Sequence, residues 1–188
     1  MIRPWRVLAS RHVVADRWIR VRADHCQTAE GVDIDPFYVL EYPDWVQIVA
    51  ISPQQEVLLI RQYRHGVGQT SLELPAGAVD SADPNVLAAA ERELLEETGC
   101  KGRAGRVVHC SAVNPANHTN RLHTVLITEV EAVQAPAQDP TEVIEVVWTP
   151  RDAALAAACS GAIPALQAAS LLAGYMTLGW LVAPEIMS

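Results

Sequence analysis

The fold is decided by one stretch of the chain, DPNVLAAAERELLEETG, which covers residues 83–99. We expect this stretch to form a helix, because its interior is rich in residues that favour helices. Asp83 is a favourable N-cap residue, Pro84 suits the first turn, and Gly99 suits the position that follows the last turn. The stretch therefore predicts a capped helix that ends at Thr98.

Three glutamates mark one face of this helix. Glu93, Glu96 and Glu97 are spaced i, i+3 and i+4, so their carboxylates lie side by side. Like charges at that spacing repel one another and raise one another's pKa unless a positive charge lies between them. A divalent cation that prefers oxygen ligands, Mg²⁺ or Mn²⁺, would compensate them. The alternative interpretation is an acidic face that is simply solvated.

Extended segments are expected on both sides of the helix. Residues 46–52 and 56–63 are apolar and β-branched and are joined by Pro53-Gln54-Gln55, which predicts a hairpin buried on both faces. We expect further strands at residues 17–24, 33–42, 70–74, 103–112, 121–130 and 143–148, and helices at residues 151–159 and 165–181. The order predicts an α/β fold with helices over a mixed sheet. Residues 75–82 are expected to form a loop.

The N-terminal segment is interpreted as a separate β appendage. Its two extended runs are joined by the turn-forming Ala29-Glu30-Gly31. The expected organisation is an antiparallel appendage over residues 1–43, followed by one catalytic domain over residues 44–188.

Composition argues against several classes of protein. The formal net charge of -8 disfavours a surface that binds nucleic acid. Four scattered cysteines without a CxxC pair, and an N-terminus that does not resemble a signal peptide, predict a cytoplasmic protein with reduced thiols. Residues 165–183 carry no charge, but polar residues and glycines interrupt them, so we expect a buried helix and no membrane span.

Beyond these patterns, the chain resembles a known family. Gly77 and the helix are similar to the Nudix box, G-x5-E-x7-R-E-U-x-E-E-x-G-U, in which U is a bulky aliphatic residue. Three further segments resemble its ADP-ribose pyrophosphatase branch: residues 60–64 (IRQYR), 73–77 (ELPAG) and the loop 114–120. The box is one residue longer than the pattern, Asp83 replaces its first Glu, and Cys100 replaces its final U. Asp83 is expected either to cap the helix or to support the metal site.

The resemblance implies a Nudix-type α/β/α sandwich and assigns roles on the helix. Glu93 and Glu97 would be the main metal ligands, and Glu96 would bind a further ion or orient water. The carbonyl of Ala76 would complete the coordination, and Arg92 would hold the glutamates through salt bridges.

A general base is expected on another segment, in residues 139–145 before the last strand. Glu142 is favoured over Glu145, and the alternative is that both are ordinary surface charges.

Substrate contacts are expected from two regions. Arg64 and Arg61 follow a buried strand and suit bidentate contacts with phosphate, with Arg64 preferred. Glu73 would accept from a ribose hydroxyl or support the metal site, and its alternative is a pair with a neighbouring arginine. His118 and Asn117 would touch the distal sugar, although a lone loop histidine is more often solvated.

The predicted activity is metal-dependent hydrolysis of the pyrophosphate in a nucleoside diphosphate linked to another group, with ADP-ribose or another nucleotide sugar favoured. The alternatives are a GDP-sugar, a dinucleoside polyphosphate or an oxidised nucleoside triphosphate as substrate, or an inactive protein that senses a ligand. The resemblance further implies a homodimer in which the appendage is exchanged.

Overall fold

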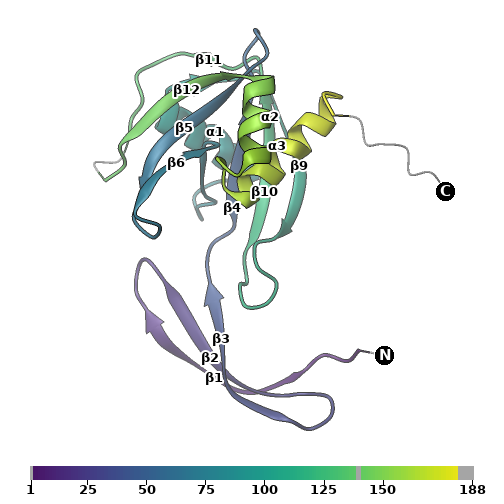
Figure 1. The fold of residues 1–188 in the computed structure, drawn as a ribbon. Coiled ribbons are helices and arrows are strands. Elements are labelled where there is room, and N and C mark those ends of the chain that lie inside the picture. The colour runs from purple at the N-terminus through teal and green to yellow at the C-terminus, as the bar shows by residue number, and fades with distance from the viewer. Residues whose placement is uncertain (1, 139–140, 182–188) are drawn as a thin grey trace, which may run out of the picture. The chain divides into compact units, whose positions relative to one another are not determined.

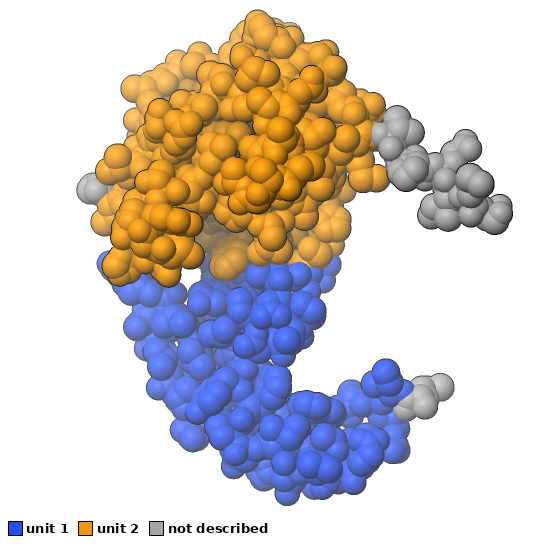
Figure 2. Space-filling model, in the orientation of Figure 1, with its two compact units in different colours: residues 1–44, 112–121 blue, residues 45–111, 122–188 orange. Residues whose placement is uncertain are grey.

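The computed structural model describes residues 2–138 and 141–181. The chain divides into two compact units, which Figure 2 shows in different colours. Unit 1 comprises residues 1–44 and 112–121, and unit 2 comprises residues 45–111 and 122–188. Each unit has its own sheets and is described by itself.

Unit 1 is built on a three-stranded antiparallel sheet (Figure 1). Its strands are β1 (Arg6–Ala15), β2 (Arg20–Gln27) and β3 (Asp33–Glu41), in that order across the sheet. The sequence predicted only the last two, so β1 is a correction. Every residue of β1 is exposed, and without a buried face the strand has no alternation of apolar and polar residues by which to recognise it.

Unit 2 contains two sheets and a short β-pair. The first sheet has the order β7 (Ala76–Ala78), β4 (Trp45–Ala50), β10 (Arg121–Thr128) and β9 (Ala104–Ala112). It is mixed, because β4 is parallel to β10 and antiparallel to β7. The second is antiparallel, with the order β12 (Ile144–Pro150), β5 (Glu56–Arg64) and β6 (Gln69–Glu73). Strands β8 (Cys100–Lys101) and β11 (Glu131–Ala132) form the pair.

The helices cover both faces of these strands. Helix α1 (Val86–Thr98) lies behind them in Figure 1, whereas α2 (Arg151–Ser160) and α3 (Ala165–Thr177) lie in front. Two hydrophobic clusters separate the layers, one packed with α1 and the other with α2 and α3. The expected α/β/α sandwich, with an N-terminal antiparallel sheet, is confirmed.

The predicted hairpin of residues 46–52 and 56–63 is wrong. Strands β4 and β5 belong to different sheets and share one bridge, between Ile51 and Val57. Both edges of β4 are already paired, with β7 and β10. Alternate residues of β4 enter the two hydrophobic clusters, with Val46 and Ile48 facing α1 and Val49 facing α3. An apolar run that is buried on both faces does not reveal which strand it pairs with.

The start of α1 also differs from the prediction. Asn85, rather than Asp83, is the N-cap residue, and its side chain accepts a hydrogen bond from the backbone nitrogen of Ala88 at 3.0 Å. At the other end, Gly99 has a φ of 71° and its N–H donates to the carbonyl of Leu95, as expected for a glycine cap.

Two smaller differences concern the segment before α1 and the end of α3. The expected loop 75–82 contains strand β7, and α3 ends at Thr177 rather than at residue 181. Within the described residues, no helix combines the length and the apolar character needed to cross a bilayer.

Candidate active site

Strand β7 connects the acidic helix to the rest of the site. The backbone N–H of Ala76 donates to a carboxylate oxygen of Glu97 at 3.1 Å, and the carbonyl of Ala78 accepts from Arg92 at 3.0 Å. Pairing with β4 fixes β7 in turn, since Gln47 lies opposite Ala76. The first sheet therefore sets the position of the helix carboxylates.

Gly77 lies between these two contacts, against the carboxylate of Glu93. A Cβ built on Gly77 would lie 2.0 Å from the carboxyl carbon of Glu93, so any larger residue would displace that side chain. Glycine is needed here for close approach rather than for an unusual backbone angle.

Arg92 organises the acidic face of α1. Its guanidinium makes a bidentate pair with Asp83, at 3.1 and 3.0 Å, and bonds to Glu93 at 2.9 Å and to Glu96 at 3.0 Å. With the Ala78 carbonyl, these bonds use the full donor capacity of a guanidinium. The pairing with Arg92 holds the pKa of Asp83 below its ordinary value. Asp83 thus has a structural role, but through Arg92 rather than as a helix cap.

Glu97 and Glu93 are carboxylates with little access to water. Glu97 is only 5% exposed, and burial raises its pKa to about 8, with the negative charge of Glu93 adding to the effect. Burial likewise raises the pKa of Glu93 to about 6, against the opposing effect of Arg92. One buried and one partly buried carboxyl group that resist ionisation fit a site completed by a cation.

Glu96 is placed differently from the other two glutamates. Its side chain is 48% exposed and pairs with Arg92 one turn earlier. Over residues 2–138 and 141–181, no three His, Cys, Asp or Glu side chains are grouped closely enough to hold a metal ion. The donor set available from the structure is therefore Glu93 and Glu97, with the Ala76 carbonyl beside them.

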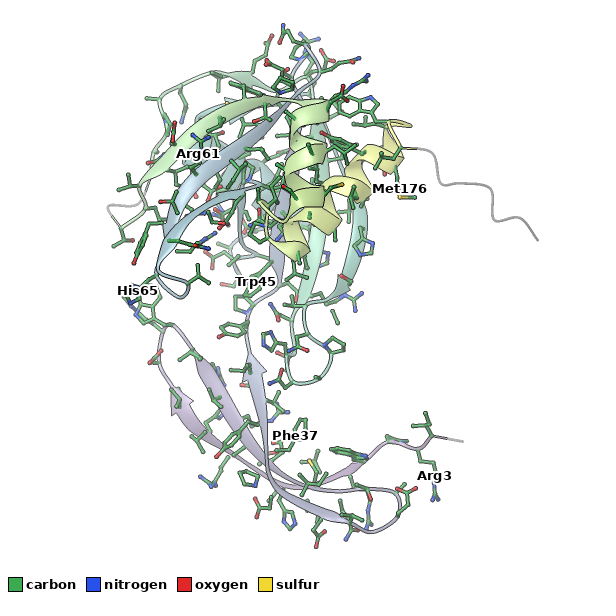
Figure 3. All side chains as sticks on the ribbon, viewed as in Figure 1. Arg3, Phe37, Trp45, Arg61, His65 and Met176 are labelled. Carbon is green, nitrogen blue, oxygen red and sulfur yellow. The ribbon has the colours of Figure 1, made fainter. Side chains whose placement is uncertain are left out.

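A cavity of about 660 Å³ lies beside β7. Its wall is formed by residues from strands, the loop before β12 and the start of α3, among them Trp45, Gln47, Arg64, Glu73, Glu142 and Gln167. Figure 3 shows Trp45 at the start of β4. All three residues of β7 also line the cavity, which has the volume of a small-molecule site.

Arg64 and Glu73 form a bidentate ion pair in the cavity wall, at 2.9 and 2.6 Å. Glu73 is buried and also accepts from the side-chain amide of Gln167 at 2.7 Å. The pair with a neighbouring arginine, one of the two expectations for Glu73, is the arrangement seen. It leaves one terminal nitrogen of Arg64 for other partners.

The two candidate bases differ in position. Glu142 lines the cavity, and its charge raises the pKa of both Glu93 and Glu97. Glu145 instead lies opposite Arg61 in the β5–β12 register and pairs with it at 3.4 Å, both side chains being exposed. Of the segment expected to supply a base, residues 139–140 lie outside the described residues.

Asn117 and His118 belong to unit 1. The carbonyl of Asn117 accepts from the backbone nitrogen of Leu40 at 2.8 Å, and the ring of His118 lies 5.6 Å from that of Tyr42. The Nδ1 atom of His118 is buried without a hydrogen-bond partner in the described part of the chain. These two residues therefore help attach the loop 114–120 to β3.

Two cavity residues, Gln47 and Gln167, were missed by the sequence analysis. Both are polar residues in otherwise apolar segments, and both are buried. That contrast was the only signal in the sequence, and Gln167 is one of the polar residues that interrupt the apolar stretch 165–183.

Comparison with known proteins identifies the family. The NUDIX domain matches residues 42–168, and the nucleoside diphosphate sugar hydrolase N-terminal domain matches residues 5–40. The chain belongs to the Nudix hydrolase family, whose members generally use divalent metals.

Individual relatives point to one branch of that family. The chain is 34% identical over 101 residues to an ADP-sugar pyrophosphatase of Mus musculus, covering 51% of this chain and 46% of the relative. It is 32% identical over 98 residues to an ADP-ribose pyrophosphatase of Mycobacterium tuberculosis, covering 52% and 47%. The chain thus spans about half the length of these two curated relatives.

A solved structure extends the likeness to nearly the whole chain. The crystal structure of an ADP compounds hydrolase superposes with a TM-score of 0.82 at 21% identity, covering 96% of this chain and 97% of that one. At this identity the match establishes the fold.

Proposed function

We propose that this protein hydrolyses the pyrophosphate of a nucleoside diphosphate linked to another group, with ADP-ribose or another nucleotide sugar as substrate. The products are a nucleoside monophosphate and a sugar phosphate. The observation that carries the proposal is the shared wall: β7 binds Glu97 and Arg92 through its backbone and lines the cavity that contains Arg64. The names of the two curated relatives support the choice of an ADP-linked substrate.

The residues beside β7 fit a divalent cation. Glu93 and Glu97, with the carbonyl of Ala76, would hold Mg²⁺ or Mn²⁺, and Glu96 is free on its outer side to reach a further ion. When bound, the cation neutralises pyrophosphate oxygens and lowers the pKa of a water molecule.

The remaining steps belong to the chain itself. Arg92 keeps the carboxylates of Glu93 and Glu96 in place, which avoids reorganisation during the reaction. The free nitrogen of Arg64 binds a phosphate oxygen, oriented by the pair with Glu73. Glu142, which lines the same cavity, accepts the proton of the attacking water.

A substrate panel with matched variants tests the proposal. Wild-type protein is incubated with ADP-ribose, GDP-mannose, diadenosine polyphosphates and nucleoside triphosphates, with Mg²⁺, Mn²⁺ or chelator, and released phosphate monoesters are measured. Metal-dependent cleavage of a nucleotide sugar is expected, with loss of turnover in Glu93→Gln. The control is Glu91→Gln, which removes the same charge from an exposed position of α1. No cleavage of any nucleotide sugar by the folded protein would refute the proposed activity.

Unit 1 supports a proposal about assembly. Large apolar side chains are exposed on and around β1: Trp5, Val7, Leu8, Val13, Val14 and Trp18. A group of exposed apolar side chains of this extent is typical of an interface. We therefore propose that a second copy of the chain covers this sheet to form a homodimer. Light scattering should give twice the monomer mass, and a monomer at micromolar concentration would contradict it.

We also propose that the protein acts in the cytoplasm on a small-molecule nucleotide. Its four cysteines are free, and Cys26 and Cys100 are buried thiols, which suits a reducing compartment. Fractionation of cells that express the full chain would test this location.

A further inference from the structure

Helix α3 carries a stripe of small and polar residues on the face that packs against the strands. Gln167, Ser170 and Gly174 are spaced i, i+3 and i+7, and all three point toward the sheet. The side chain of Gln167 accepts from the backbone N–H of Leu74 and donates to the carboxylate of Glu73. A Cβ on Gly174 would lie 2.8 Å from the side chain of Val49. The stripe therefore holds the start of α3 close to the cavity.

Ser170 is the middle of a buried chain of hydrogen bonds. Its hydroxyl lies 2.7 Å from that of Thr124 on β10 and 2.7 Å from the side-chain oxygen of Gln47 on β4. Thr124 is fully buried, and within the described chain Ser170 is the one residue bonded to its hydroxyl. The hydroxyl hydrogen of Thr124 must therefore point to Ser170, which in turn donates to Gln47.

This direction determines which end of Gln47 faces the cavity. Its Oε1 atom is used by Ser170, so the amide nitrogen is the outer end. Among the residues that the structure describes, none is hydrogen-bonded to that nitrogen. Gln47 is only 6% exposed, yet it lines the cavity. Because Gln47 lines the cavity, this nitrogen can donate to whatever occupies the cavity there, water or a ligand.

The position of Gln47 relates this donor to the proposed metal site. Gln47 lies directly opposite Ala76 in the antiparallel register, so the two side chains project from the same face. Adjacent strands are about 4.8 Å apart, so the Gln47 side chain begins about that far from the backbone of Ala76.

The first turn of α3 adds further donors to the same cavity. Pro164, Ala165, Leu166 and Gln167 all line it, and the N-cap Pro164 offers no side chain to cap the helix. The first N–H groups of a helix have no acceptor within the helix, and its N-terminus carries a partial positive charge. Arg64, which is paired with Glu73 in the wall of the same cavity, keeps one terminal nitrogen as a further donor.

We propose that Gln47 and the first turn of α3 bind a phosphate oxygen of the substrate, so that Gln47 is a substrate-contacting residue held in place by Ser170. The inference rests on the proposed function for the identity of the substrate, but the anion site can be tested without turnover. Gln47 contributes a hydrogen bond to an anion, and Ser170 acts only by orienting the Gln47 amide.

Titration with inorganic pyrophosphate in the presence of chelator tests the site directly. Calorimetry should detect millimolar binding to wild-type protein and at least tenfold weaker binding to Gln47→Glu, which replaces the donor with a negative charge. Gln54→Glu adds the same charge in the exposed turn after β4 and should bind as wild type does. If Gln47→Glu does not fold, Gln47→Met keeps the length without a donor and should weaken binding about tenfold. Wild-type protein that binds no pyrophosphate at 10 mM overturns the site, as does unchanged binding by a folded Gln47 variant.

Two hydroxyl variants separate positioning from general stability. Ser170→Ala frees the Gln47 amide and should weaken pyrophosphate binding about three- to tenfold. Thr124→Val leaves the bond from Ser170 to Gln47 in place and should change the affinity for pyrophosphate less than twofold. With a nucleotide sugar, Gln47→Met should raise KM about tenfold and change kcat little. Equal effects of the two hydroxyl variants would overturn the positioning role. If no nucleotide sugar is cleaved, the proposed function fails, and the pyrophosphate titration still decides the anion site.

Discussion

Replacing Glu97 with Gln should stabilise the metal-free protein at high pH. The pKa of Glu97 rises from an ordinary 4.5 to about 8 in the folded state, mainly because of burial. A carboxyl group with a raised folded-state pKa contributes its full stability below pH 4.5. It loses that contribution as the pH rises through about 8.

The size of the effect follows from the difference between the two pKa values, 4.5 and about 8. Each pH unit between the two pKa values corresponds to about 1.4 kcal/mol, so ionised Glu97 destabilises the fold by at most about 5 kcal/mol. Glutamine removes the charge and keeps an acceptor for the Ala76 N–H, which Glu97 binds at 3.1 Å. We expect a gain of roughly 2 to 5 kcal/mol at pH 9, or a Tm increase of roughly 5 to 15 °C.

Thermal unfolding followed by circular dichroism provides the measurement. Wild type and Glu97→Gln are compared at pH 5 and pH 9, with chelator and with Mg²⁺. The difference with chelator should be large at pH 9 and small at pH 5. Mg²⁺ should raise the Tm of the wild type and leave the variant unchanged, because the variant lacks a charged ligand. Glu96→Gln, at a half-exposed position, should shift Tm by less than about 2 °C. A Glu97→Gln protein less stable than the wild type at pH 9 with chelator would refute the reasoning.

Four other substitutions test the site and the helix. Glu142→Gln should lower kcat by roughly two to four orders of magnitude in steady-state assays, whereas Glu145→Gln should leave kcat within about threefold; the reverse order would reassign the base. Asn85→Ala should lower the free energy of unfolding in urea by about 1 kcal/mol through loss of the α1 cap, and no change would place the cap elsewhere. Gly77→Ala should push away the Glu93 carboxylate and weaken Mg²⁺ binding, measured by calorimetry, at least tenfold; unchanged affinity would exclude Glu93 as a ligand.

The helix and its acidic face were predictable because they depend on local chemistry. Spacing of i, i+3 and i+4 places side chains on one face whatever the helix packs against. Gly99 likewise ends α1 because a left-handed residue is required there. The N-cap was misplaced by two residues, since Asp83 and Asn85 are both good caps and only the partner of Asp83, Arg92, decides between them.

The site beyond α1 depended on contacts between distant segments. Glu142 and Glu145 are similar in sequence context, and the register of β12 against β5 pairs one of them with Arg61. Arg61 and Arg64 also differ in direction. Side chains alternate between the two faces of a strand, so two residues three positions apart on β5 point to opposite faces.

By itself, then, the sequence determined the class of fold, the acidic helix with the glycine that ends it, and the kind of chemistry that such a helix serves. Tertiary structure alone decided that β4 and β5 join different sheets, and that β7 both contacts Glu97 and lines the cavity. It also decided that Gln47 turns a free amide toward that cavity. The physical reason is range: helix periodicity and capping act within a few residues. Strand pairing and the direction of a buried hydrogen-bond chain depend instead on groups far apart in the sequence, such as Gln47, Thr124 and Ser170.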